Sequence, residues 1–204
     1  MADNKQTRTG RINLPNILTL IRIGLVPPII TLVLIPWRNQ GFFNVLTAIL
    51  FLLAAMTDLF DGVIARNTNQ VTDFGKFLDP IADKMLILGT LTAIAGSERF
   101  AYIRLIVVIS TCIILLRELT VTSIRMVAHS YDGTVIAANF PGKLKTVASV
   151  VTVFIILIEG TLFENGLGGI FVLSYIFLIV TVLLTVWSGF IYIQKYFSYI
   201  DPRK

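Results

Sequence analysis

The chain has 204 residues, of which 55% are hydrophobic and only 14% are charged, and its mean hydropathy is +0.82. This composition is far from that of soluble domains and is typical of a protein that crosses a membrane several times. The net charge of +5 is spread over interrupted apolar segments and forms no dense basic tract with interleaved aromatic residues. Nucleic-acid binding is therefore not expected, and an anionic lipid or an anionic substrate is favoured.

Six apolar runs follow one another along the chain and predict six transmembrane helices. They cover residues 15–37, 42–65, 77–96, 101–127, 144–163 and 168–196. Because one span needs about 20 apolar residues, six spans with short loops use the whole of 1–204 as a single all-α membrane domain. No room is left for a soluble catalytic domain, so any chemistry must use groups on the helices or on the short loops.

Basic residues predict the orientation of these spans. An even number of spans places both termini on the same side of the membrane. Thirteen of the 17 Lys and Arg residues fall on that side or at the helix ends facing it, and three fall opposite. Since loops rich in Lys and Arg stay in the cytoplasm, both termini are expected to be cytoplasmic.

Four aspartates flank the loop between the second and third runs. Asp58 and Asp61 are three residues apart, and Asp79 and Asp83 are four apart, so on helices each pair projects from one face. If the two helices form an antiparallel hairpin, the two faces can converge. Four unpaired carboxylates within a membrane would cost on the order of 10 kcal/mol, and the basic residues nearby are fewer than the acids.

Divalent cations would compensate these carboxylates better than ordinary ion pairs. A ligand set made only of oxygen, without a neighbouring His or Cys, favours Mg²⁺ or Mn²⁺ over zinc. A solvated acidic helix end would explain single carboxylates but not all of the spacings. A cation transporter or channel would place acids near the membrane midplane and in both halves of the chain, whereas these cluster in one hairpin.

Small residues and one cation accompany the first two aspartates. Gly62 and Ala65 remove side-chain bulk, which would let a nucleotide or a phosphate approach the helix backbone, and Arg66 adds a positive charge beside that gap. Gly75 lies near the start of the third helix, whose positive dipole end favours both a carboxylate and a bound phosphate.

From Asp58 to Asp83 the sequence reads D-x2-D-G-x2-A-R-x8-G-x3-D-x3-D. It matches the signature of the CDP-alcohol phosphotransferase family at every specified position, and the chain resembles that family. The resemblance implies a homodimeric membrane fold of six helices with its site open to the cytoplasm. It also implies a place in the bacterial cytoplasmic membrane and transfer of a phosphatidyl group from CDP-diacylglycerol to a small polar alcohol.

The resemblance also implies a role for each signature residue. Asp83 would be the general base that takes the proton from the attacking hydroxyl. Two divalent cations, Mg²⁺ or Mn²⁺, would be held by Asp58, Asp61, Asp79 and Asp83. CDP-diacylglycerol would be bound by Asp58, Gly62, Ala65 and Arg66.

Segments 13–22, 117–125 and 136–146 resemble the bacterial branch of this family that uses sn-glycerol 3-phosphate as acceptor. One departure from that branch is Thr122-Ser123-Ile124-Arg125, which keeps the basic residue. This acceptor is a dianion near neutral pH, and basic side chains suit its phosphate. The candidates are Arg117, Arg125, Lys143 and Lys145, with Arg22 as a further one.

Arg117 and Arg125 are eight residues apart, about two helical turns, and so share a face. Each basic residue taken singly could instead anchor the chain at the membrane surface, and Arg22 could snorkel to that surface. Relatives that accept inositol phosphate or serine are the alternative within the family. The roles of Glu118 and of the only histidine, His129, stay open.

Overall fold

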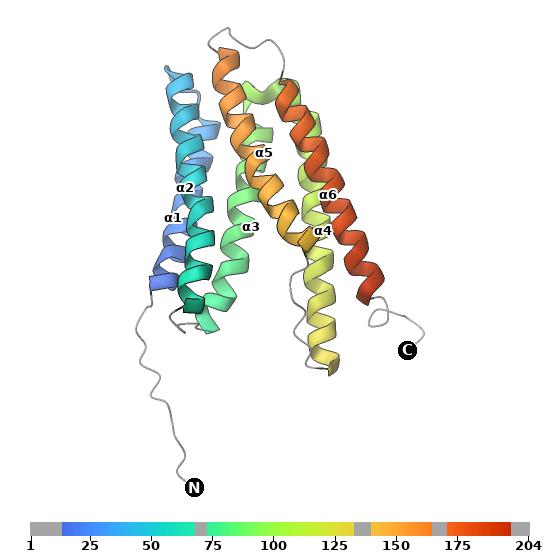
Figure 1. The fold of residues 1–204 in the computed structure, drawn as a ribbon. Helices are drawn as coiled ribbons and strands as arrows, with labels where there is room; N and C mark the ends of the chain where they lie inside the picture. Colours follow the sequence, from blue (N-terminus) through green and yellow to red (C-terminus); the bar gives the residue numbers. More distant parts are fainter. Residues whose placement is uncertain (1–13, 68–72, 133–139, 165–170, 197–204) are drawn as a thin grey trace.

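The computed structural model describes residues 14–67, 73–132, 140–164 and 171–196, which form a bundle of long helices (Figure 1). Within these ranges the elements are α1 (Leu14–Leu34), α2 (Gln40–Asn67), α3 (Asp73–Gly96), the 3₁₀ helix η1 (Glu98–Ile103), α4 (Arg104–Asp132), α5 (Phe140–Glu164) and α6 (Val172–Tyr196). The six predicted apolar runs are confirmed as six α-helices. The fourth run begins in the last residues of η1, which is kinked at Phe100 (φ −104°, ψ 23°), and continues as α4.

Four of these helices are long and apolar enough to cross a membrane. They contain the stretches Asn16–Leu34, Glu98–Val127, Phe140–Leu162 and Val172–Tyr196. In α2 the described apolar stretch, Gly41–Thr57, is shorter than a full span. In α3 the first half of the helix contains aspartates, which interrupts its apolar stretch. The chain is therefore an all-α, multi-pass membrane protein, and these four helices carry that conclusion.

Successive helices run in opposite directions (Figure 1), and the packing between them closes into a ring. Helix α1 packs against α2 and α3, α5 packs against α2 and α6, and α4 packs against α6 and α3. Direct packing between α2 and α3 is slight. The expected hairpin of the second and third helices is therefore antiparallel but bridged by α1. We call the end where α1, α3 and α5 begin, and where α2, α4 and α6 finish, the site end.

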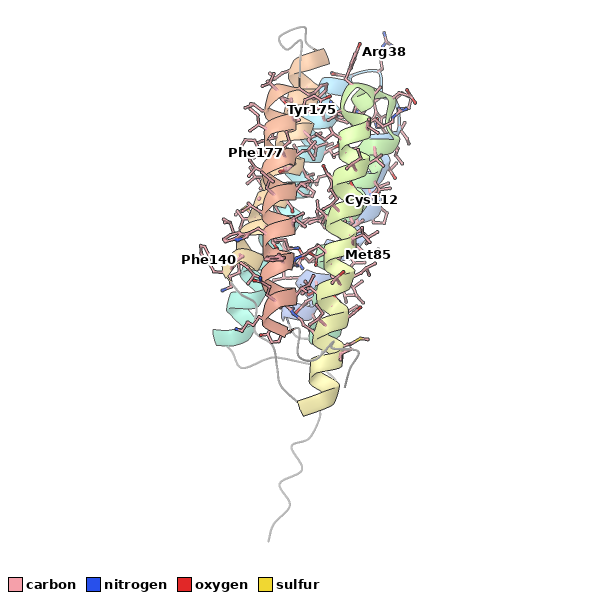
Figure 2. The ribbon with its side chains drawn as sticks, turned by 90° about the vertical axis from the view of Figure 1, so that its right-hand side faces the viewer. Arg38, Met85, Cys112, Phe140, Tyr175 and Phe177 are labelled. Atoms are coloured by element: carbon pink, nitrogen blue, oxygen red, sulfur yellow. The ribbon has the colours of Figure 1, made fainter. Side chains whose placement is uncertain are left out.

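The helices divide their apolar side chains between an inner and an outer face. Phe51, Ile94 and Leu157 are fully buried inside the ring, whereas Leu105 is 75% exposed. Figure 2 shows the outer side chains along α4 and α6, including Cys112 and Phe177. Helices that are apolar on all sides are typical of proteins surrounded by lipid.

At the end opposite the site end, charged side chains form hydrogen bonds with the ends of neighbouring helices. Arg99 donates to the carbonyls of Leu32, at 2.8 Å, and of Val33, close to the end of α1. The carboxylate of Glu159 on α5 accepts the backbone N–H of Ser174, at 2.7 Å, at the start of α6. A cation suits a helix C-terminus and an anion suits an N-terminus. Both charges therefore hold helix ends together here.

Candidate functional site

The face of α1 that points into the bundle is polar at the site end. Asn16, Thr19 and Arg22 follow at three-residue spacing and are 5%, 1% and 0% exposed. The Thr19 hydroxyl donates to Oδ1 of Asp79 on α3 at 2.7 Å. The sequence did not single out Asn16 or Thr19. The available signals for them are their spacing within an otherwise apolar run and their place in the family-like segment 13–22.

Arg22 connects the same face of α1 to α2. Its Nε donates to the carbonyl of Ala54 and to Oγ1 of Thr57, both at 3.2 Å. The suggestion that this side chain snorkels to the membrane surface is wrong, because Arg22 is fully buried and its Nε bonds α2 inside the bundle. A buried arginine needs such hydrogen-bond acceptors in the low dielectric of its surroundings.

A cavity of about 150 Å³ opens between α1, α2, α3 and α5. Arg22 and Asp83 supply charge to its wall. The other lining residues are mostly apolar: Leu52, Ala55, Met56, Leu86, Thr146, Val147, Val150 and Val151. An acidic and a basic group therefore share one small space with apolar side chains, which is the kind of surrounding that an amphipathic ligand needs.

The two described aspartates lie one turn apart on α3. Asp79 is exposed and Asp83 is half-buried. The backbone of α2 stays helical to Asn67, so positions 58 and 61 fall on its last turns at the site end. The side chains of Asp58, Asp61, Gly62, Ala65 and Arg66 lie outside the described residues.

The described part of the acidic site offers hard oxygen donors. Asp79 and Asp83 provide carboxylate oxygens. Thr19, which donates a hydrogen bond to Asp79, provides a hydroxyl oxygen. This chemistry fits Mg²⁺ or Mn²⁺. Among the described side chains, no three carboxylate, imidazole or thiol groups come together. Asp79 and Asp83 would thus need further ligands from α2 to enclose a cation.

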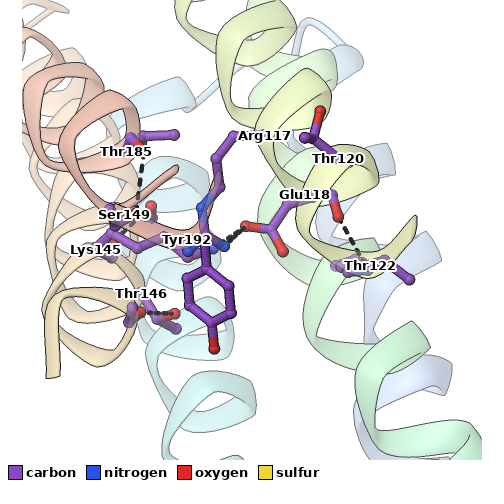
Figure 3. A network of polar contacts seen from close by, with 12 residues as sticks. Arg117, Glu118, Thr120, Thr122, Lys145, Thr146, Ser149, Thr185 and Tyr192 are labelled. Carbon is purple, nitrogen blue, oxygen red and sulfur yellow. Dashed lines mark hydrogen bonds and ion pairs between the residues drawn. The ribbon is translucent and has the colours of Figure 1, made fainter. Parts of the chain in front are cut away.

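A second group of charges joins α4 to α5 (Figure 3). The Glu118 carboxylate accepts from Nη1 of Arg117, at 3.1 Å, and from Nζ of Lys145. The side chains of Arg117 and Lys145 are each only 9% exposed, and that of Glu118 is 14% exposed. Charges buried to this degree require partners, and Glu118 supplies one to both cations. We call Arg117, Glu118, Arg125 and Lys145 the basic cluster.

The basic cluster also reaches α6. Nη2 of Arg125 donates to the hydroxyl of Tyr192 at 2.7 Å. The guanidinium carbons of Arg125 and Arg117 lie 5.2 Å and 5.8 Å from the centre of the same Tyr192 ring. Three predicted residues, Arg117, Arg125 and Lys145, are therefore brought together. Lys143 is exposed, and no described contact joins it to the others.

One contact connects the acidic helix to the basic cluster. Nζ of Lys84, the residue after Asp83, donates to Oγ1 of Thr122 at 2.9 Å. Thr122 lies one turn after Glu118 on α4, and its hydroxyl also bonds the Glu118 carbonyl at 2.7 Å. The carboxylates of α3 and the cations of α4 therefore lie on helices that are bonded together near the site end.

This bundle is that of a multi-pass helical membrane protein that brings the carboxylates of α3 and the basic cluster near to one end. More narrowly, the chain belongs to the CDP-alcohol phosphatidyltransferase family, whose sequence profile matches residues 12–187.

Three relatives illustrate the similarity. The CDP-diacylglycerol–glycerol-3-phosphate 3-phosphatidyltransferase of Bacillus subtilis is 38% identical, over 90% of this chain and 94% of its own. The protein of the same name from Pectobacterium atrosepticum is 31% identical, over 89% of this chain and 93% of its own. A probable phosphatidylglycerophosphate synthase of Mycobacterium tuberculosis is 34% identical, over 96% of this chain and 90% of its own.

Proposed function

We propose that this chain transfers the phosphatidyl group of CDP-diacylglycerol to sn-glycerol 3-phosphate, giving phosphatidylglycerol phosphate and CMP. It is thus a CDP-diacylglycerol–glycerol-3-phosphate 3-phosphatidyltransferase. Relatives named for this reaction match about nine-tenths of the chain. The observation that carries the choice of a phosphate-bearing acceptor is the basic cluster, which lies next to the acidic helix α3 because Lys84 bonds Thr122. The relatives favour sn-glycerol 3-phosphate among such acceptors.

The charge of the basic cluster suits a phosphate-bearing acceptor. Arg117, Arg125 and Lys145 contribute three positive charges, and Glu118 removes one. The remaining two equal the charge of a phosphate monoester dianion. Guanidinium groups bind phosphate through paired hydrogen bonds, and an ammonium group adds a mobile point charge. Serine lacks this phosphate and would leave the cluster without its partner.

The acidic site is proposed to hold two divalent cations, Mg²⁺ or Mn²⁺, on Asp58, Asp61, Asp79 and Asp83. Bound there, such ions would screen the diphosphate of the donor and stabilise CMP as the leaving group. Thr19 restricts the rotation of the Asp79 carboxylate through its hydrogen bond, which supports a preformed ligand.

The remaining roles belong to side chains of the chain itself. Asp83 takes the proton from the acceptor hydroxyl, whose oxygen then attacks the phosphorus on the lipid side of the diphosphate. Gly62, Ala65 and Arg66, together with Asp58, bind the cytidine diphosphate part. The amphipathic cavity next to Asp83 supports a substrate that brings lipid and phosphate to the same place.

We further propose that all six helices cross the bacterial cytoplasmic membrane, with both termini and the site end in the cytoplasm. The basic bias of the sequence supports this orientation. Helices α2 and α3 are not among the four apolar spans identified above. The shorter of the two, α3, has 24 residues and is about 36 Å long, which is more than the hydrocarbon thickness of about 30 Å. A homodimer is proposed from the family resemblance.

A direct assay tests the proposed reaction. Purified protein in detergent receives CDP-diacylglycerol, Mg²⁺ and either sn-glycerol 3-phosphate, inositol phosphate or serine, and CMP release and the lipid product are measured. We expect turnover with sn-glycerol 3-phosphate and none after complete chelation of divalent cations. No CMP release with this acceptor would overturn the proposal, and turnover with inositol phosphate or serine instead would assign the chain to another branch of the family. Flux of Mg²⁺ through liposomes without CMP release would favour a transporter.

A further inference from the structure

We propose that Tyr192 of α6 is a positioning residue for the acceptor phosphate, an inference that rests on the proposed function. Tyr192 lies far outside the aspartate signature, within an apolar helix, and its side chain is 1% exposed. Its hydroxyl accepts the hydrogen bond from Arg125, and its ring lies against both arginines of the basic cluster. It would act on the acceptor through these two side chains.

The geometry explains why an aromatic ring is needed at this position. Arg117 and Arg125 lie two turns apart on α4, and each has several rotatable bonds that must be restricted before the pair can bind one phosphate. A guanidinium within about 6 Å of a ring centre is attracted by the π electrons, more strongly where water is excluded. The buried ring of Tyr192 offers this attraction to both arginines at once. Figure 3 shows the ring beside Arg117.

Gly189 contributes space one turn before the ring. A β-carbon added at Gly189 would lie 3.1 Å from Cγ of Arg117, closer than ordinary contact. Gly189 and Tyr192 are three residues apart and thus share a face of α6. Gly189 leaves space for the aliphatic part of the Arg117 side chain, and the ring of Tyr192 contacts its guanidinium group. Helix α6 therefore contacts both parts of this side chain.

Glu118 and Tyr192 restrain the cluster from two sides. Glu118 bonds Arg117 and Lys145, whereas Tyr192 contacts Arg117 and Arg125. Arg117 is common to both sets and is held between a carboxylate and a ring. A substitution of Tyr192 should therefore weaken binding of the acceptor phosphate and leave the donor site, on α2 and α3, unchanged.

Steady-state kinetics of Tyr192→Phe and Tyr192→Leu test this role. Tyr192→Phe removes the hydroxyl and keeps the ring, and Tyr192→Leu removes both. The control is Tyr175→Phe, the same chemical change at the other end of α6, where the hydroxyl bonds the carbonyl of Tyr102 at 2.9 Å. The KM for sn-glycerol 3-phosphate, the KM for CDP-diacylglycerol, kcat and the melting temperature are measured for each variant.

We expect Tyr192→Phe to raise the KM for sn-glycerol 3-phosphate about threefold to tenfold, and Tyr192→Leu to raise it by more than about tenfold. The KM for CDP-diacylglycerol should stay within about twofold, and Tyr175→Phe should resemble the wild type in both constants. Gly189→Ala should reproduce the selective rise by displacing Arg117 while Tyr192 is retained. If Tyr192→Leu does not fold, Tyr192→Phe and Gly189→Ala decide the question.

Three results would overturn the inference. The first is an unchanged KM for sn-glycerol 3-phosphate in Tyr192→Phe and Gly189→Ala. The second is an equal rise of both KM values, and the third is a loss of kcat that follows the melting temperature, since either would indicate a general structural role. A wild type that releases no CMP with sn-glycerol 3-phosphate would overturn the proposed function and this inference together. A wild type active with that acceptor, combined with any of the three results, overturns this inference alone.

Discussion

The hydroxyl of Thr19 donates a 2.7 Å hydrogen bond to the carboxylate of Asp79 and so joins the first helix to the acidic helix. One turn further on, Arg22 of the same face bonds Ala54 and Thr57 of α2. Helix α1 therefore sets the distance between the two helices that carry the aspartate signature. Its polar face belongs to the site, although none of its residues is part of that signature.

Thr19→Val removes the hydrogen bond to Asp79 and keeps the shape of the side chain. A hydrogen bond to a charged group contributes about 1.5–3 kcal/mol, so we expect kcat/KM to fall about tenfold or more and the Mg²⁺ concentration for half-maximal rate to rise. Thr31→Val is the control, because that hydroxyl bonds the carbonyl of Pro27 within α1, far from the site end. Titration of the rate with Mg²⁺ provides the measurement. An unchanged metal requirement in Thr19→Val would show that Asp79 needs no such support.

Asp83→Asn keeps the size of the side chain but cannot take a proton from the acceptor hydroxyl. We expect the variant to bind CDP-diacylglycerol in the presence of Mg²⁺ and to lose turnover by at least about a hundredfold, the lower range of general-base contributions. Calorimetric titration with CDP-diacylglycerol and the CMP-release assay measure the two properties separately. Normal turnover would refute the assignment of Asp83 as the base.

Glu118→Gln removes the negative charge that Arg117 and Lys145 share. The two buried cations then repel each other without a counter-charge, and loss of one partner of a buried ion pair costs about 3–5 kcal/mol. We expect a lower melting temperature and a kcat/KM for sn-glycerol 3-phosphate reduced about tenfold. The double variant Glu118→Gln, Lys145→Met should recover part of the stability but none of the activity. If Glu118→Gln keeps the wild-type kinetics for the acceptor, Glu118 only balances the charge of Arg117 and Lys145 and does not position them for the acceptor.

The positions of the helices could be predicted from the sequence, but which helices pack against each other could not. Long apolar runs predict membrane helices with little ambiguity, and the predicted limits differ from the observed ones by only a few residues. Helices that are apolar on all sides, however, carry no pattern that selects a neighbour. The ring order, with α1 between α2 and α3, therefore emerges only from the structure.

The site was predictable where charges stand in apolar surroundings. The aspartates stand out because a charge in a membrane helix requires an explanation. Arg117, Arg125 and Lys145 follow from the resemblance and from the charge of a phosphate-bearing acceptor. Thr19 and Tyr192 do not stand out in the sequence, because hydroxyl groups and aromatic rings are ordinary in membrane helices. Arg22 was identified, but its burial depends on acceptors from α2 that its own sequence context does not show.

Gly160→Ala tests the packing of the end opposite the site end. A β-carbon there would lie 2.7 Å and 3.0 Å from two ring atoms of Phe100, which is fully buried. Overpacking of this kind typically costs about 1–3 kcal/mol, so the melting temperature in detergent should fall. The control is Gly24→Ala, where no atom beyond the adjoining residues and the backbone of its own helix lies within 4 Å of the added carbon, and no loss is expected.

The second substitution Phe100→Leu should restore part of the stability lost in Gly160→Ala, because it shortens the side chain that meets the new methyl group. Both KM values should stay close to those of the wild type at low temperature, since the acidic site and the basic cluster lie at the other end of the bundle. A Gly160→Ala variant as stable as the wild type would mean that Phe100 can move aside. A selective change in the KM for either substrate would mean that packing at this end is transmitted along the helices to the site end.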